Sequence, residues 1–392
     1  MNGLIKQLKR RTPLGWLQLI RQKSRLAVAL SGVAFADILI LMQIGFQAAL
    51  YDSNTRLHQS LNADLVLISP QTLYLLRIAT FPRRRLYQAM SVPGVKYADS
   101  LYLNVATWKN PQTQKETSIF IIGFNPDRPA FILPEVNQNL HLIKLPDTVL
   151  FDRASRGQYQ KAVAAVEQGK IVKTELEKRT ITIGGLYKIG ASFGADGSLM
   201  TSDQNFLMLF PRRDAGSVSI GLIKVQPGYD IKQVQTGLKS YLPGDIIVLT
   251  KQEFVDFEKD YWSKNTAIGF VFSLGVVMGF VVGVIIVYQV LSTDVNDHIK
   301  EYATFKAIGY RHIYFLSVVF EEAIILAIMG FFPGMVLSTG LYSLTRKATN
   351  LPIYMTLGKA SFVLILTIIM CGISGAIATR KLQAADPADM FS

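Results

Sequence analysis

The histidines and the single cysteine are the residues best suited to catalysis or metal binding, and none of them stands in a recognisable motif. The sequence holds no HExxH pair for zinc and no GxSxG nucleophile elbow. No two histidines are paired, and none has a cysteine partner at metal-ligand spacing. The histidines are His58, His141, His298 and His312. The acidic residues are spread as on a solvated surface. We therefore predict no catalytic residue, no bound metal and no enzymatic activity in this chain.

Two Gly-Lys pairs raise the question of a phosphate-binding loop. Gly169-Lys170 and Gly358-Lys359 both lack the following Ser or Thr and the upstream glycine that such a loop needs. We predict no cofactor on this chain. If the protein uses ATP, a separate subunit binds the nucleotide.

The segment from residue 286 to residue 313 carries charge between two apolar runs. Residues 297–308 are predicted to form a short helix that includes Glu301 and Lys306. Gly309 then follows as a left-handed C-cap. A charged helix held between two membrane spans is well placed to press on a partner in the cytoplasm.

The elements that hold this segment are apolar. Half of the 392 residues are hydrophobic, only 18% are charged against about 25% in soluble domains, and the mean hydropathy is +0.28. The apolar residues cluster in runs near the roughly 20 residues that a helix needs to cross a bilayer. We predict four transmembrane helices, at residues 26–50, 268–291, 318–341 and 360–379. The lone cysteine, Cys371, lies in the last run, so no intrachain disulfide can form.

Basic residues beside the spans predict the topology by the positive-inside rule. The residues before the first span include several Lys and Arg and no acid, so both termini are expected in the cytoplasm of a cell whose inner (plasma) membrane holds the protein. This topology places Arg346, Lys347 and Lys359 in an outer loop, which disagrees with the positive-inside rule. The N-terminal basic cluster is larger, so we let it decide the orientation. The expected cytoplasmic parts are residues 1–25, 292–317 and 380–392, and the expected periplasmic parts are residues 51–267 and 342–359.

The net charge of +13 comes partly from the basic residues beside the predicted spans. Basic residues beside spans contact anionic lipid headgroups, and here they are divided between both sides of the membrane. We therefore predict contact with membrane lipid and no binding of nucleic acid.

Glycines spaced by four predict a helix-packing face in the second span. Gly275, Gly279 and Gly283 place a smooth strip on one helix face, where a second backbone can approach closely. The strip could pack within the chain or across a homodimer, and the sequence leaves both open.

Acidic residues in or near the spans are expected to face protein or water. We interpret Asp37, within the first span, as a polar contact between helices. Glu321 and Glu322 lie near the start of the third span, and we predict an interfacial position for them and not an ion pathway.

The long segment 51–267 is large enough for one or two soluble domains. Its helical ends, 51–62 and 251–264, predict two stalk helices that lift the domain off the membrane. The middle, approximately 151–210, is richer in glycine and in alternating patterns, which favours an inserted, mostly-β lobe.

The end of this segment predicts a βαβ-like unit. A strand at 217–225 and a strand at 245–250 flank a helix at 230–241, with Asp230 as its N-cap. The predicted fold class is thus an α-helical integral membrane protein with a large extracytoplasmic α+β domain between its first two transmembrane helices.

Several stretches resemble one known family. The stretch EYATFKAIGYRHIYFLSVVFEEAIILAIMGFFPG, at 301–334, resembles the coupling helix and following span of the MacB/FtsX-type permeases of ABC transporters, the mechanotransmission group. The tail RKLQAADPADMFS, at 380–392, resembles that family's Asp-Pro-Ala ending. The order of one span, a large domain and three spans is similar too. The first span and the residues after it most resemble the cyanobacterial DevC-like permeases.

The resemblance implies a permease subunit of an ABC exporter. Its partners would be a second copy of the chain, an ABC ATPase subunit that carries the ATP, a periplasmic membrane-fusion protein and, indirectly, an outer-membrane TolC-like channel. The βαβ unit and the inserted lobe would match the family's porter and adaptor-contacting parts. The expected substrate is a glycolipid or another envelope lipid. By position, the ATPase-coupling residues would be Glu301, Tyr302, Phe305, Lys306 and Gly309.

Three other interpretations remain open at this point. The same architecture serves FtsX-like regulators of cell-wall hydrolases and lipoprotein-releasing permeases. A ligand sensor is a further alternative, although the sequence has no kinase-like or HAMP-like output segment.

Overall fold

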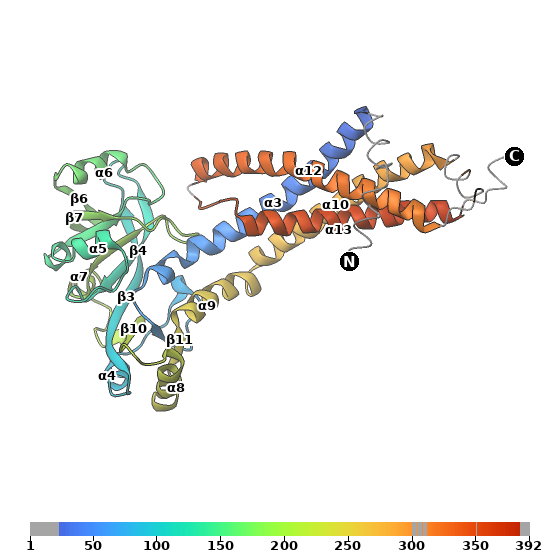
Figure 1. Cartoon of the computed structure of the whole chain (residues 1–392). Coiled ribbons are helices and arrows are strands. Elements are labelled where there is room, and N and C mark those ends of the chain that lie inside the picture. The colour runs from blue at the N-terminus through green and yellow to red at the C-terminus, as the bar shows by residue number, and fades with distance from the viewer. Residues whose placement is uncertain (1–22, 300–303, 305–307, 309–311, 350, 385–392) are drawn as a thin grey trace. The chain divides into compact units, whose positions relative to one another are not determined.

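The computed structural model describes residues 23–299, 304, 308, 312–349 and 351–384. The described chain divides into two compact units (Figure 1). The helical unit comprises the residues up to Ala48, those from Ile268 to Ala348 and those from Ile353 onward. The loop domain comprises Ala49–Ala267 and Thr349–Pro352.

Four long apolar helices account for most of the helical unit. They are α3 (Lys23–Ser60), α10 (Ala267–Asp297), α12 (His312–Thr349) and α13 (Leu357–Ala384). Each is long and apolar enough to cross a membrane, which confirms the prediction of four such helices. The helices α3 and α12 extend beyond the predicted spans at 26–50 and 318–341.

The loop domain is built on a nine-stranded mixed sheet with the order β11-β1-β10-β3-β4-β8-β5-β7-β6. Its strands are β1 (Leu65–Ile68), β3 (Val95–Lys109), β4 (Glu116–Phe124), β5 (Thr148–Asp152), β6 (Val172–Leu176), β7 (Arg179–Tyr187), β8 (Ser198–Ser202), β10 (Ile220–Val225) and β11 (Ile247–Thr250). A separate short pair joins β2 (Phe81–Pro82) to β9 (Ser217–Val218). The helices are η1 (Leu75–Arg77), α4 (Arg84–Met90), α5 (Pro134–Gln138), η2 (Leu142–Lys144), α6 (Gln160–Glu167), α7 (Asp203–Leu209), α8 (Ile231–Tyr241) and α9 (Lys251–Lys264).

The predicted βαβ-like unit forms, but its two strands are not neighbours. Strand β1 lies between β10 and β11 and runs antiparallel to both, so β10, α8 and β11 make a split βαβ unit. In the same way, β10 lies antiparallel between β1 and β3, with α4 as the crossover. Asp230 caps α8 as predicted, because its carboxylate accepts a hydrogen bond from Gln233 N at 3.2 Å.

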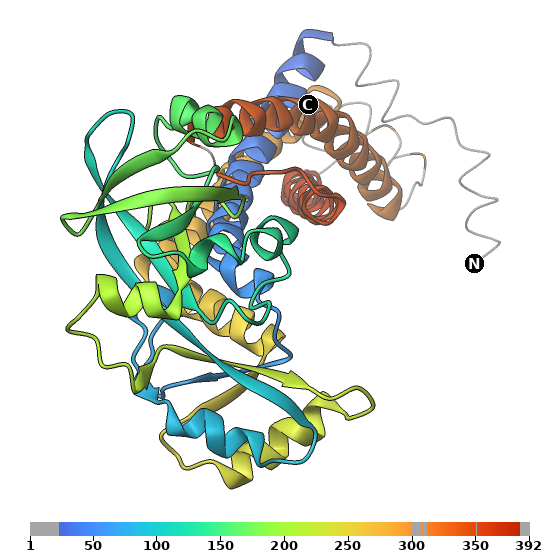
Figure 2. The same cartoon turned by 90° about the vertical axis from the view of Figure 1, so that its left-hand side faces the viewer.

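The other half of the sheet begins earlier in the chain than the predicted lobe at 151–210. It starts with β4 at Glu116, and the predicted boundary at residue 151 falls inside β5. Strand β3 joins the halves, because its first residues pair with β10 and its later ones with β4. Figure 2 shows this long strand running through the domain. The lobe is therefore part of one continuous sheet.

Two cores form on opposite faces of this sheet, as the two-residue period of a strand requires. In β1, Leu65 and Leu67 face one core, while Val66 and Ile68 face the other. Helices α4 and α8 cover part of the first face, where Figure 2 shows them side by side. The last turns of α3 and the start of α9 cover part of the second face.

The two segments predicted as stalk helices are helical and pack against the sheet. That they lift the domain off the membrane stays a prediction. Leu57 of α3 and Phe254 of α9 are buried in the second core. His58 Nε2 lies 3.6 Å from Glu258 Oε2, and the same oxygen accepts a hydrogen bond from Leu75 N at 2.8 Å. Burial of these apolar and aromatic side chains holds both helices against the sheet.

Candidate functional site

The residues predicted to couple to an ATPase lie outside the described residues. These are Glu301, Tyr302, Phe305, Lys306 and Gly309. The structure does describe the helices that flank them, because α10 ends at Asp297 and α12 begins at His312. The site is therefore built from these two helices and their neighbours in the helical unit.

A charged cluster ties the end of α10 to the start of α3. Arg25 of α3 places its Nη1 atom 3.5 Å from Asp294 Oδ1, and its Nη2 atom donates a hydrogen bond to Asp297 Oδ2. His298 Nε2 lies 3.9 Å from Asp294 Oδ1. Asp294 is buried, so this is more than a surface ion pair, and removing Arg25 would leave an uncompensated charge.

Glu322 of α12 lies beside this cluster and is fully buried. Within the described chain, neither of its carboxylate oxygens receives a hydrogen bond from a donor. Its neighbour is the carboxyl of Asp294. Two ionised carboxylates have no proton to share, so this contact is a hydrogen bond only while one of them is protonated. Contacts with α10 bury Glu322 within the helical unit. The interfacial position predicted for it stays a prediction.

The glycine strip of α10 faces other helices of the same chain. A Cβ atom at Gly275 would lie 2.4 Å from the Gln43 side chain, and one at Gly279 would lie 2.9 Å from Ile40. At Gly283 it would lie 2.1 Å from Met370 Sδ of α13. The absence of side chains thus permits close contact with α3 and α13. A role of this strip in a dimer stays a prediction.

The helix α3 makes similar contacts with α12. A Cβ atom at Gly330 would lie 2.6 Å from Val33, and one at Gly334 would lie 3.1 Å from the Ala34 carbonyl oxygen. Tyr342 also donates a hydrogen bond to the Leu41 carbonyl of α3. The three other long helices therefore all pack on α3.

Asp37 of α3 makes the predicted polar contact between helices. Thr367 Oγ1 of α13 donates a hydrogen bond to Asp37 Oδ1 at 2.6 Å. Both residues are fully buried. A short bond of this kind fixes two helices together in apolar surroundings, where unpaired polar groups are costly.

The described residues contain no group of three or more His, Cys, Asp or Glu placed to hold a metal ion. Sequence reasoning also missed the Arg25 cluster. Its members come from α3 and from the end of α10, far apart in the sequence, and the local signal was the four-residue spacing of Asp294 and His298.

Comparison with known proteins places part of this site in a family. Residues 273–387 match the family model described as FtsX-like permease C-terminal. The match includes most of α10, the loop that follows it, α12 and α13. Together with the four apolar helices, it identifies a membrane protein with an FtsX-like permease domain in this segment. No curated protein matches the chain.

Solved structures similar to the chain include two bacterial domains. One is the periplasmic region of MacB from Actinobacillus actinomycetemcomitans, with 10% identity over 50% of this chain and 92% of that chain and a TM-score of 0.33. The other is the extracellular domain of the noncanonic ABC-type transporter YknZ from Gram-positive bacteria, with 13% identity over 47% of this chain and 99% of that chain and a TM-score of 0.31.

Proposed function

We propose that this chain is the permease subunit of an ABC exporter, in which a separate ATPase drives the membrane helices. The observation that carries the proposal is the FtsX-like permease match over residues 273–387. That segment contains the loop at 292–317, which the sequence predicts to be charged, helical and cytoplasmic.

The ATPase acts on this loop through Glu301, Tyr302, Phe305, Lys306 and Gly309. Charged residues set the docking register, while Tyr302 and Phe305 fill a groove on the partner, since aromatic anchors carry much of an interface's binding energy. A push on the loop then shifts the ends of α10 and α12. The close contacts at Gly283 and Gly330 oppose independent movement of single helices, so the shift spreads to α3 and α13.

The full assembly that we propose contains two copies of this chain, with both termini in the cytoplasm and the loop domain in the periplasm. A membrane-fusion protein and an outer-membrane TolC-like channel complete the route. The cargo is a glycolipid or another envelope lipid, by the DevC-like resemblance.

Purification of the full chain from its native membrane tests the assembly. The proposal expects an ABC ATPase and a membrane-fusion protein to co-purify, as identified by mass spectrometry. Recovery of a cell-wall hydrolase and no fusion protein would instead support a regulator. Recovery of no ATPase would contradict every version of the proposal.

Substitution in the loop tests the coupling. In vesicles that contain the chain and its ATPase, Phe305→Ala and Gly309→Ala should abolish transport while ATP hydrolysis continues. Gly340→Ala in α12 is the control, because a Cβ atom there meets nothing within 4 Å. Normal transport by both loop variants would count against the coupling role.

A further inference from the structure

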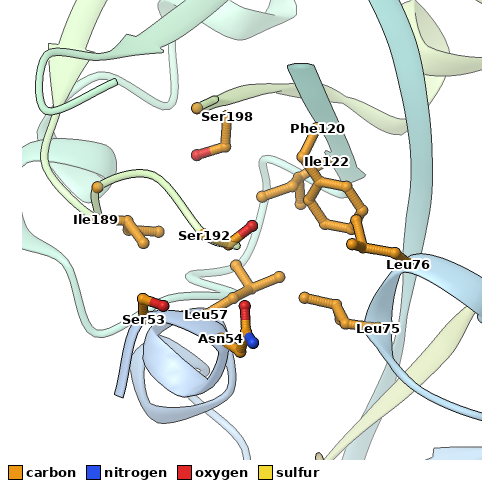
Figure 3. Close-up of a pocket in the computed structure, with 12 residues that line it drawn as sticks. Ser53, Asn54, Leu57, Leu75, Leu76, Phe120, Ile122, Ile189, Ser192 and Ser198 are labelled. Atoms are coloured by element: carbon orange, nitrogen blue, oxygen red, sulfur yellow. The ribbon is translucent and has the colours of Figure 1, made fainter. Parts of the chain in front are cut away.

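A small cavity in the loop domain is lined by side chains from separate segments, among them Leu57 of α3, Leu75 of η1 and Phe120 of β4 (Figure 3). Its volume of about 30 Å³ leaves room for water-sized molecules and for no larger ligand. None of the residues that line it carries a charge. Buried carboxyl oxygens that have no hydrogen-bond partner among the described residues lie elsewhere, in the helical unit.

Three of these oxygens lie together where α10 meets α12. They are Oε1 and Oε2 of Glu322 and Oδ2 of Asp294, and none of them accepts a hydrogen bond from a described donor. The two carboxyls are in contact with each other. Glu322 is fully buried, and Asp294 is only 5% exposed. Carboxyl oxygens buried in this way have lost their hydration without gaining a donor in its place.

Basic groups lie beside Asp294. Arg25 Nη1 of α3 lies 3.5 Å from Asp294 Oδ1, and His298 Nε2 lies 3.9 Å from the same oxygen. Asp297 also accepts a hydrogen bond from Arg25 and shares its charge. Because Oδ1 faces these bases, Asp294 is the member of the pair that keeps a negative charge, and its Oδ2 atom is free to accept a hydrogen bond from Glu322.

Glu322 has acidic neighbours only. Among the described residues, its charged neighbours are Asp294 and the adjacent Glu321. The helix α13 packs on this part of α12 at Gly375, and residues 360–379 of that helix include no acidic or basic side chain. An ionised Glu322 would thus face a second anion with no described cation to compensate it. Two carboxylates that share a buried site do not both ionise readily.

We propose that Asp294 and Glu322 hold one proton between them, carried by Glu322, whose O–H group donates a hydrogen bond to Asp294 Oδ2. One proton gives Oδ2 a donor and removes the charge of Glu322, while Arg25 balances the charge that stays on Asp294. The described residues contain no group of three or more His, Cys, Asp or Glu that would hold a metal ion instead.

The proton joins α12 to α10 next to the helix ends that flank the loop at 292–317. When it leaves, a hydrogen bond becomes a repulsion between two anions, and the contact between the helices loosens. The inference does not rest on the proposed function, because the chain binds the proton without ATP or a partner protein. Failure of the experiments below would therefore leave the exporter proposal untouched.

Infrared spectroscopy of the full chain in nanodiscs, without an ATPase, detects the proton directly. The C=O stretching band of a protonated carboxyl is separate from the bands of a carboxylate. We expect such a band at neutral pH that Glu322→Gln removes. Glu321→Gln is the matched control, at a partly exposed side chain, and should keep the band.

Asp294→Asn should remove the band as well, because its amide can donate to Glu322 in place of the proton, so either variant that folds decides the question. If a cation outside the described residues holds Glu322 in its ionised form, wild type and Glu322→Gln will have the same spectrum in this region. That result would overturn the proposal.

The pH dependence of thermal unfolding supplies a second measurement. Once unfolded, a Glu carboxyl loses its proton above about pH 4.3, so the folded chain holds a proton that the unfolded chain releases. Relative to Glu322→Gln, whose amide donates without taking up a proton, the ratio of folded to unfolded wild-type chain should fall about tenfold per pH unit above this value. Glu321→Gln should keep the wild-type slope. A gap between wild type and Glu322→Gln that does not change with pH would contradict the bound proton.

Hydrogen–deuterium exchange tests whether the proton joins the two helices. At a pH where the infrared band of Glu322 has disappeared, the end of α10, at 287–297, should exchange faster in wild type than in Glu322→Gln. Both proteins are measured at the same pH, so the intrinsic exchange rate cancels. Equal exchange under these conditions would show that the proton does not hold α10 to α12.

Discussion

Two fully buried carboxyls, one in each unit, have opposite surroundings. Asp152 in the loop domain accepts hydrogen bonds from Gly190 N at 2.7 Å, Ala154 N at 3.0 Å and Ile189 N at 3.2 Å. Ser198 Oγ adds a longer contact at 3.4 Å. Glu322 in the helical unit receives no hydrogen bond from any described donor and lies beside Asp294 instead.

These surroundings suggest two different roles. Asp152 is a structural residue of the loop domain, whereas Glu322 is placed to respond to protonation or to a change of charge nearby. Asp152 accepts hydrogen bonds from one buried and two partly buried backbone groups, so it holds the end of β5 to the segment after β7. Glu322 satisfies nothing, and its charge is opposed by a second acid. Protonation, or a change of charge nearby, should therefore affect Glu322 more strongly than Asp152. Glu322 lies next to the helix ends that flank the predicted coupling loop.

Replacing Asp152 by Ala should have the largest effect. It leaves one buried and two partly buried backbone N–H groups without this acceptor and should lower the free energy of unfolding by about 3 kcal/mol. Thermal unfolding of the full chain in detergent can be followed by the fluorescence of Trp108 and Trp262, two of its three tryptophans. Asp127→Ala, at an exposed ion pair with Lys144, is the control. Equal melting temperatures for Asp152→Ala and Asp127→Ala would contradict the structural role of Asp152.

The same carboxyl gives this prediction a pH dependence. Burial raises the pKa of Asp152 above its unfolded value. Its contribution to stability is thus fully present below the unfolded pKa of about 3.9 and declines as the pH rises through the folded value. The gap in melting temperature between wild type and Asp152→Ala should therefore narrow as the pH is raised. A gap that widens would show that the pKa is lowered instead.

Filling the glycine contact in the helical unit should have the next largest effect. Gly283→Leu forces a side chain into Met370 and Ala36, and overpacking of this kind costs about 1–3 kcal/mol. Gly340→Leu is the matched control, in a part of α12 with open space. Detergent-solubilised chains can be compared by the temperature at which monodispersity is lost in size-exclusion chromatography. If Gly340→Leu is equally damaging, close packing at Gly283 is not the cause.

Neutralising Glu322 should increase the stability of the chain, whereas the other substitutions should decrease it. The amide of Glu322→Gln can donate to Asp294, so the variant should gain about 0.5–1.5 kcal/mol of stability. Asp152→Asn, the equivalent change in the loop domain, sets an amide N–H₂ against backbone donors and should lose stability. Melting curves of the two variants test this contrast directly. Destabilisation by both would mean that Glu322 is also a framework residue.

The smallest effect is expected at the start of α9. Thr250 Oγ1 accepts from Glu253 N at 3.1 Å, and Glu253 Oε2 accepts from Thr250 N at 2.8 Å. Thr250→Ala should cost about 1 kcal/mol. The Thr250 N–H lowers the pKa of Glu253, so this carboxylate's contribution is present above the unfolded pKa and lost as the pH falls through the folded value. A loss of thermal stability in Glu253→Gln that grows on acidification would contradict this sign.

Local sequence signals predicted much of the fold. The N-cap at Asp230, the helix at 251–264 and the four apolar helices all have patterns contained in a few turns. The place of β1 between β10 and β11 could not be predicted in this way, because a distant segment pairs there. Some features of the candidate site could likewise be predicted from the sequence, and others could not. The glycine spacing of α10 was visible, whereas the burial of Glu322 and the lining of the cavity depend on segments that meet only in the folded chain.

We propose that ATP bound to a separate subunit changes the conformation of the loop domain through the loop at 292–317. Hydrogen–deuterium exchange of the reconstituted complex, with and without ATP, tests it most directly. We expect ATP to change exchange in the loop domain, for example in α9, and Phe305→Ala to abolish this change while the ATPase still binds ATP. Exchange in residues 49–267 that is the same with and without ATP, in a complex that hydrolyses ATP, would contradict it.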